Sequence, residues 1–269
     1  MAPQTWHYGL VAKWWAEFNE GGPEIDYFRR FIEPDGQPAL DVACGTGRLL
    51  LPYLRAGLDV DGCDVSADMI ALCRERAEGE GLSPTLFVQP MHELDPPRSY
   101  RTIVVCGGFA LGSDRAQDLQ ALERFYQHLA PGGTLVLDNE VPYADSQQWQ
   151  RWLREGRTFV PRAWSDDDPE RRRASDGTEL ALQSRLLGLD PLEQRATLEI
   201  RARQWRDGEL IAEEDHTLDI GLYFTHELVL MLERAGFDVA AVHGGHEERA
   251  ATADDDFVVF VARKPLSVA

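Results

Sequence analysis

The sequence predicts an α/β protein with a seven-stranded, mostly parallel sheet, helices on both faces and the last strand antiparallel, plus an inserted antiparallel β lid. Short apolar runs alternate with helical patterns from Leu40 to Val141, which indicates repeated strand–helix units. Residues 178–223 show no helical pattern, and two apolar runs close the chain. The length of 269 residues and the 43% apolar content are enough for a sizeable core.

The first five strands are expected in the stretches PALDVA, LDVDGCDV, PTLFVQ, RTIVVCGG and GTLVLDNE. Helices are expected over residues 48–56 and 67–80. A third helix lies between the last two strands, where apolar residues recur at helical spacing until the sequence PGG ends the pattern. Strand–helix units joined by short links imply that these strands run parallel.

The pattern changes after Pro142, and an inserted unit is expected over residues 146–223. A short helix with Trp149 and Trp152 precedes the charged, turn-rich segment PRAWSDDDPERRRASDG. The stretch TLEIRARQW then alternates apolar and charged residues, and an Asp-Gly turn in RDGE joins it to LIAEEDHTLDIGL. About three antiparallel strands are therefore expected. Residues 224–269 supply one more helix and two strands, FDVAAVHG and DFVVFVARK, which are close enough to pair antiparallel.

The net charge of −19 argues against a nucleic-acid partner and against an anionic membrane surface. No apolar run approaches the length of a membrane-spanning helix, and the N-terminus lacks a signal-peptide pattern. The four cysteines show no Cys-x-x-Cys spacing and are expected to be reduced, packed thiols. These features favour a cytoplasmic protein that binds neither nucleic acid nor membrane. A monomer or homodimer is expected.

No metal site is expected, because no cluster of His, Cys, Asp or Glu has the spacing of a ligand set. The nearest approach is HGGHEE, which places His243 and His246 three residues apart. These histidines are expected in a solvated loop or at a substrate entrance.

The stretch ALDVACGTGRLLL carries the strongest functional signal. A strand that ends in Gly45-Thr-Gly47 and leads into a helix brings bare backbone close to a ligand. The dinucleotide fingerprint would need a third glycine where Leu50 stands, and no P-loop lysine is present, so a nicotinamide-dependent oxidoreductase is disfavoured. Asp64 ends the next strand about twenty residues on, a distance that suits a carboxylate on two ribose hydroxyls.

The segments LDVACGTGRL, VDGCDVSADMI and HLAPGGTLVLDNE, in this order, resemble the class I S-adenosylmethionine-dependent methyltransferases. The resemblance covers about residues 38–140 and the closing strands. It implies a Rossmann-like fold with S-adenosylmethionine (SAM) as cofactor and S-adenosylhomocysteine (SAH) as product. Three units follow: residues 1–36 as an N-terminal helical lid segment, residues 37–145 with 224–269 as the SAM-binding core, and residues 146–223 as an inserted substrate lid.

The resemblance also implies a set of cofactor contacts. The glycine loop would line the methionine half of SAM, and Asp64 would hold the ribose hydroxyls unless it only caps a helix. An acid after the third strand is missing in VQPMHEL, so backbone there would have to recognise adenine. One of the two adjacent N-terminal tryptophans would line the pocket while the other packs. The expected cofactor-binding residues are Ala43, Gly45, Gly47, Asp64, Val65, Met69, Met91, His92, Cys106, Gly107 and Trp15; Val65 and Met69 could instead be ordinary core.

Methyl transfer from a sulfonium is an in-line displacement that needs alignment, dry surroundings and a neutral nucleophile. A base, if one is used, is expected in the loops at the carboxyl ends of the strands. Glu140 is the first candidate, although it could be only a structural acceptor. His7 and Tyr8 could reach the site from the N-terminal lid segment. His216 lies on the same strand face as Leu218, Ile220 and Leu222, which is expected to face the domain. It could act in catalysis, or it could be a hydrogen-bonded core histidine.

The function expected from the sequence is SAM-dependent methyl transfer to a nitrogen, or an oxygen, of a small-molecule metabolite. A β lid that excludes water is typical of small-molecule members of the resembled family, and an acidic chain suits an amine-bearing substrate. The alternatives are a protein or tRNA methyltransferase, which the acidity disfavours, and a non-catalytic SAM-binding protein, which the intact glycine loop disfavours.

Overall fold

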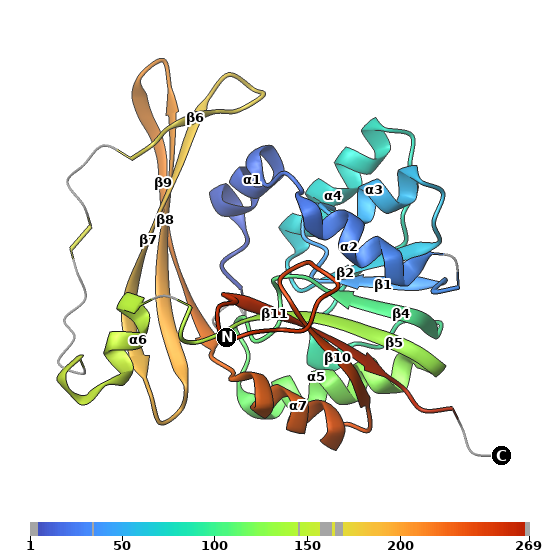
Figure 1. Cartoon of the computed structure of the whole chain (residues 1–269). Helices are drawn as coiled ribbons and strands as arrows, with labels where there is room; N and C mark the ends of the chain where they lie inside the picture. The colour runs from blue at the N-terminus through green and yellow to red at the C-terminus, as the bar shows by residue number, and fades with distance from the viewer. Residues whose placement is uncertain (1–4, 34, 145, 157–162, 165–168, 267–269) are drawn as a thin grey trace.

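A computed structural model describes residues 5–33, 35–144, 146–156, 163–164 and 169–266. Its core is a seven-stranded sheet in the order β10-β11-β5-β4-β1-β2-β3 (Figure 1). Every paired strand runs parallel to its neighbours except β11, which is antiparallel to both β5 and β10. This confirms the predicted sheet. The strands are β1 Ala39–Val42, β2 Val60–Asp64, β3 Leu86–Val88, β4 Tyr100–Val105, β5 Leu129–Glu140, β10 Asp238–Gly244 and β11 Phe257–Arg263.

Helices cover both faces of this sheet because alternate strand residues point to opposite sides. Ile103 belongs to an apolar cluster with α5 and α7, whereas its neighbour Val104 belongs to a second cluster with α2 and α3. The helix expected over 48–56 is observed as the shorter α3. The helices are α1 Gly9–Phe18, α2 Pro23–Ile32, α3 Leu50–Arg55, α4 Ala67–Gly79, α5 Arg115–His128, α6 Ser146–Trp152 and α7 Thr225–Arg234, with short 3₁₀ turns η1 Met91–Glu93 and η2 Arg154–Gly156.

A second, antiparallel sheet has the order β6-β7-β8-β9. It contains four strands, not the three expected, because the charged segment before it contributes the two-residue strand β6. The Asp207-Gly208 turn forms as predicted, with both residues at positive φ (51° and 83°), as this hairpin type requires. The strands are β6 Arg172–Arg173, β7 Glu179–Asp190, β8 Arg195–Arg206 and β9 Glu209–Gly221.

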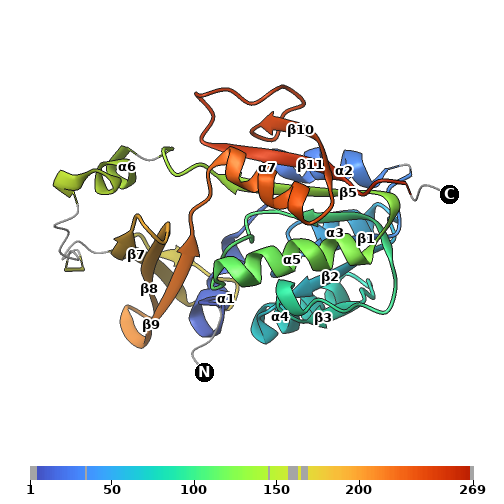
Figure 2. The same ribbon diagram turned by 90° about the horizontal axis from the view of Figure 1, so that it is seen from below.

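The N-terminal helix α1 joins the two sheets. It lies between the small sheet and α4 in both views (Figures 1 and 2). Leu10 and Val11 pack against Leu180 and Ile200 of the small sheet. The backbone N–H of Gly9 donates to Asp68 of α4 at 2.7 Å, and that of Leu10 donates to Glu214 of β9 at 2.8 Å. The start of the chain therefore ties the small sheet to the core.

The structure also bears on the cysteines and on membrane-spanning helices. All four cysteines are free thiols, and only Cys106 is not fully buried. In the part of the chain that the structure describes, no helix is long and apolar enough to cross a membrane.

Candidate functional site

The glycine loop after β1 takes the conformation that the sequence predicts. Ala43, Gly45 and Gly47 all have positive φ, at 59°, 54° and 90°. A Cβ on Gly45 would meet no atom within 4 Å, so its backbone borders open space. A Cβ on Gly47 would lie 2.7 Å from Leu51, so that glycine is needed for packing against α3. The two glycines of the motif therefore have different roles.

A cavity of about 280 Å³ lies at the carboxyl ends of β1, β2 and β4. This is the edge where open parallel sheets bind ligands. Gly47 does not line this cavity, although it was expected to contact the methionine half of the cofactor. The cavity lining includes the other ten residues expected to bind cofactor, namely Ala43, Gly45, Asp64, Val65, Met69, Met91, His92, Cys106, Gly107 and Trp15.

The carboxylate of Asp64 is held by backbone donors. Oδ2 accepts from the N–H of Gly45 at 2.9 Å, and Oδ1 accepts from the N–H of Ser66 at 2.8 Å. Burial raises the pKa of Asp64, and these backbone hydrogen bonds oppose the rise. The result is a preoriented acceptor in the cavity wall with lone pairs left for a ligand.

Asp41 is a second acid in the same cavity and was not identified from the sequence. Its Oδ2 atom is buried without a hydrogen-bond partner among the described residues. Burial raises the pKa of Asp41 to about 7, opposed by nearby Arg48 and reinforced by Asp64. The sequence does contain a signal for Asp41 as a functional residue. It is a charged residue between Leu40 and Val42, in a strand that is otherwise apolar and buried.

The raised pKa of Asp41 predicts a pH-dependent stability. Because the folded-state pKa of about 7 lies above the reference value of 3.8, the folded protein holds a proton that the unfolded chain releases. The free energy of unfolding of the ligand-free protein therefore falls as pH rises from about 4 to 7. Asp41→Asn is neutral throughout, so its melting temperature should exceed that of the wild type by several degrees at pH 8 and converge with it toward pH 4. Thermal melts across this range test the prediction; a difference that is the same at every pH would contradict it.

The N-terminal segment reaches the cavity through His7 and Trp15. Trp14 and Trp15 both pack against the apolar cluster beneath the small sheet, and Trp14 does not border the cavity. Burial, and secondarily His216, lower the pKa of His7 to about 4, so its imidazole is neutral at pH 7. Its ring nitrogens lie 3.1 Å from Thr5 Oγ1 and 3.1 Å from the indole nitrogen of Trp6. Both nitrogens are engaged, which leaves His7 poorly placed as a base.

Tyr8 and His216 contact each other and border neither described cavity. Their ring centroids are 4.0 Å apart, and Nε2 of His216 lies 3.1 Å from Oε2 of Glu214. The same Glu214 carboxylate accepts the N–H of Leu10. The structure therefore places these two catalytic candidates in the joint between α1 and β9, where the alternative of a hydrogen-bonded core histidine fits His216.

A second cavity, of about 750 Å³, lies between the end of β5 and the small sheet. Glu140 borders it from the core, and Gln183, Arg185 and Leu198 border it from the small sheet. The two cavities share Gly107, Gly108 and Leu111 in their walls. The two cavities therefore border the same short segment after β4.

The two histidines of HGGHEE are packed and partly buried, which corrects the expectation of a solvated loop, while the alternative of a substrate entrance stays a prediction. Nδ1 of His243 lies 2.8 Å from the hydroxyl of Tyr27. The ring of His246 lies against Phe28 and Phe257, at centroid distances of 5.6 and 4.7 Å, and its side chain is 15% exposed. These histidines pack against α2, a contact that spacing along the chain does not reveal.

Comparison with known proteins agrees with this geometry. Residues 39–133, which include the glycine loop, Asp64 and the end of β4, match the family described as the methyltransferase domain. Residues 39–133 therefore form a methyltransferase domain. In this methyltransferase domain the matched segment supplies nine of the ten predicted residues that line the first cavity, all except Trp15.

Two curated relatives share the domain. The dTDP-3-amino-3,6-dideoxy-alpha-D-glucopyranose N,N-dimethyltransferase of Streptomyces fradiae is 29% identical over 51% of this chain and 55% of its own length. The demethylmenaquinone methyltransferase of Thermus thermophilus is 34% identical over 43% of this chain and 54% of its own. The chain thus spans little more than half the length of these two curated relatives.

The fold extends beyond the matched segment. The structure of the CcbJ methyltransferase from Streptomyces caelestis superposes with a TM-score of 0.70 at 21% identity, covering 97% of this chain and 99% of that one. This likeness covers the small sheet as well as the methyltransferase domain.

Proposed function

We propose that the protein transfers a methyl group from SAM to a nitrogen, or an oxygen, of a small-molecule metabolite. The observation that supports this most directly is the pair of adjacent cavities, which share Gly107, Gly108 and Leu111 in their walls. The first is bordered by the glycine loop and three buried carboxylates (Asp41, Asp64 and Asp118), and the second by the small sheet. A donor in one and an acceptor in the other would meet at Gly107 and Gly108.

The residues of the first cavity fit SAM chemically. Asp64 would accept the two ribose hydroxyls, since it is a fixed carboxylate with lone pairs to spare. The unpartnered Oδ2 of Asp41 would accept the ammonium of the methionine half. Val65, Met69, Met91 and His92 would surround adenine. SAM supplies an activated methyl on a sulfonium, so the protein has to align the acceptor and exclude water.

The small sheet is proposed to act as a substrate lid. Residues 146–223 would form this lid over the core made by residues 37–145 and 224–269, with residues 1–36 closing the cofactor side. A roofed acceptor cavity suits a small metabolite better than a protein or tRNA surface. The sugar-nucleotide N,N-dimethyltransferase among the relatives supports an amine acceptor, and so does the net charge of −19.

The remaining parts of the proposal follow the sequence. We expect a cytoplasmic enzyme that works as a monomer or homodimer without nucleic acid or membrane. Among the four catalytic candidates, only Glu140 borders the acceptor cavity. Gly47 is proposed to shape the glycine loop without contacting the cofactor.

Calorimetric titration tests the proposed function. SAM and SAH should each bind with micromolar affinity, and NAD, included as the control, should not bind. A panel of amines and hydroxylated metabolites, beginning with dTDP-3-amino-3,6-dideoxyglucose, then tests turnover by SAH release. Failure to bind either sulfur nucleotide would reject the enzyme hypothesis, whereas binding without turnover on any acceptor would favour the non-catalytic SAM-binding alternative.

A further inference from the structure

Asp138 lies where the two cavities meet. It belongs to β5, borders the acceptor cavity, and its side chain is only 10% exposed. Its Oδ1 atom accepts the backbone N–H of Gly107 at 2.6 Å. Because Gly107 belongs to both cavity walls, this hydrogen bond fixes a buried carboxylate beside the point of transfer. Asp138 precedes Glu140 by two residues on the same strand, yet Glu140 is exposed and Asp138 is buried.

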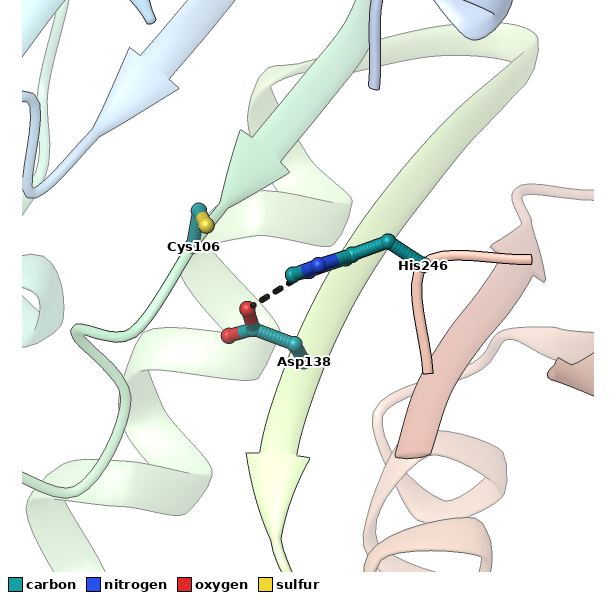
Figure 3. Close-up of side chains that lie close together, drawn as sticks. All are labelled: Cys106, Asp138 and His246. Atoms are coloured by element: carbon teal, nitrogen blue, oxygen red, sulfur yellow. Dashed lines mark ion pairs between the residues drawn. The ribbon is translucent and has the colours of Figure 1, made fainter. Parts of the chain in front are cut away.

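His246 faces this carboxylate from the loop between β10 and β11. Its Nε2 atom lies 3.5 Å from Oδ2 of Asp138 (Figure 3). Nε2 is buried and makes no hydrogen bond within the described residues. The imidazole is held by the rings of Tyr27, Phe28 and Phe257, at centroid distances of 4.7 to 5.6 Å. Apolar packing therefore fixes the ring, with Nε2 facing the Asp138 carboxylate and a ring nitrogen lying within 4.8 Å of Cys106 Sγ.

Cys106 completes the cluster, and its environment separates two explanations. Its Sγ atom lies within 4.8 Å of the Asp138 and His246 ligand atoms, which is close enough for a metal ion. However, the Arg48 guanidinium donates to Sγ at 3.3 Å, and a cation there disfavours a second cation on the same sulfur. Burial, reinforced by the Asp138 carboxylate, also raises the pKa of the Cys106 thiol, so the thiol is neutral. The geometry therefore favours the Asp138 carboxylate itself, and not a metal ion held by all three residues, as the group that meets a cationic ligand.

We propose that Asp138 receives the ammonium of the acceptor at the point of transfer, with His246 positioning the carboxylate, so that the site selects amines over hydroxyls. This inference rests on the proposed function and narrows it to N-methylation. An ammonium compensates the buried negative charge, whereas a neutral hydroxyl would leave it uncompensated. Oδ2 of Asp138 takes one proton from the ammonium. The freed nitrogen lone pair then forms the N–C bond while the S–C bond breaks, and its electron pair stays on sulfur.

Sinefungin tests this inference without knowledge of the substrate. It carries a primary ammonium at the position of the transferable methyl, whereas SAH carries no group there. Wild-type protein should bind sinefungin at least as tightly as SAH. Asp138→Asn should weaken sinefungin at least tenfold relative to SAH, because a charge-assisted hydrogen bond is lost. The control is Asp238→Asn, the same change at an exposed residue. Asp238 begins β10, at the end of that strand away from His246, and its replacement should leave the ratio of the two affinities unchanged.

The positioning role of His246 needs its own variants. His246→Phe keeps an aromatic ring among its three aromatic neighbours but removes the nitrogen that faces Asp138, so it should lower the sinefungin preference about threefold or more. His246→Gln restores a polar nitrogen and should recover the preference. SAH binding serves as an internal check of folding in each variant. If His246 had only a structural role, its replacement would weaken the binding of SAH and sinefungin equally, and the ratio of the two affinities would not change.

Three results would overturn the inference. The first is SAH binding with an unchanged sinefungin ratio in Asp138→Asn. The second is loss of the preference in Glu140→Gln but not in Asp138→Asn, which would assign the ammonium to Glu140. The third is loss of the wild-type preference after dialysis against EDTA and its return with Zn²⁺, which would assign the cluster to a metal ion. Failure of the proposed function looks different, since wild-type protein would then bind neither nucleoside.

Discussion

Asp64→Ala is expected to weaken the binding of SAH at least tenfold. The wild-type carboxylate is buried, oriented by the N–H groups of Gly45 and Ser66, and placed in the wall of the first cavity. Hydrogen bonds to a charged acceptor each contribute about 1.5–3 kcal/mol, and about 1.4 kcal/mol corresponds to a factor of ten in affinity. Loss of one such bond is therefore enough for the predicted change, which calorimetric titration with SAH measures.

The control for this variant is Asp26→Ala, which removes an exposed carboxylate from the first turn of α2. That variant should bind SAH like the wild type. The melting temperature of Asp64→Ala without ligand should fall as well, because two buried N–H groups lose their acceptor. A destabilised Asp64→Ala that still binds SAH with wild-type affinity would show that the ribose lies elsewhere and that Asp64 only caps backbone.

Gly108→Val is expected to damage both stability and cofactor binding. A Cβ on Gly108 would lie 2.3 Å from Cβ of Ala43, closer than any real contact allows. Ala43 has a positive φ of 59° and borders the first cavity, so it cannot move without disturbing the glycine loop. Overpacking of this kind costs about 1–3 kcal/mol of unfolding free energy. Denaturant unfolding should show this loss, and the affinity for SAH should fall at least tenfold.

Gly79→Ala is the matched control, because a Cβ at the last position of α4 would meet nothing within 4 Å. The unfolding free energy of this variant should stay within about 1 kcal/mol of the wild type, on the stabilising side. Wild-type SAH affinity in Gly108→Val would contradict the close approach of the two loops that the structure shows.

The catalytic candidates show the limit of prediction from the sequence. The expectation that a base lies at the carboxyl end of a strand led to Glu140 and not to Asp138. In the structure Glu140 is exposed and Asp138 is buried, and this difference depends on the strands and loops packed beside them. Tyr8 and His216 are far apart in the chain and meet only because α1 packs against β9. Contacts between distant parts of the chain leave no local sequence pattern. Tyr8 and His216 could therefore be proposed as catalytic candidates, but their position relative to the cavities could not be predicted.

The sequence by itself determined the order of the strands and helices, the glycine loop and the acid at the end of β2. These features depend on local periodicity and on strand ends that share one edge of a parallel sheet, which chain order specifies. The tertiary structure alone decided that Gly47 packs inward, that Asp41 keeps an unpartnered oxygen, and that His246 reaches Asp138. Each depends on residues distant in the chain, because burial and hydrogen-bond partners belong to the packed molecule and not to any one segment.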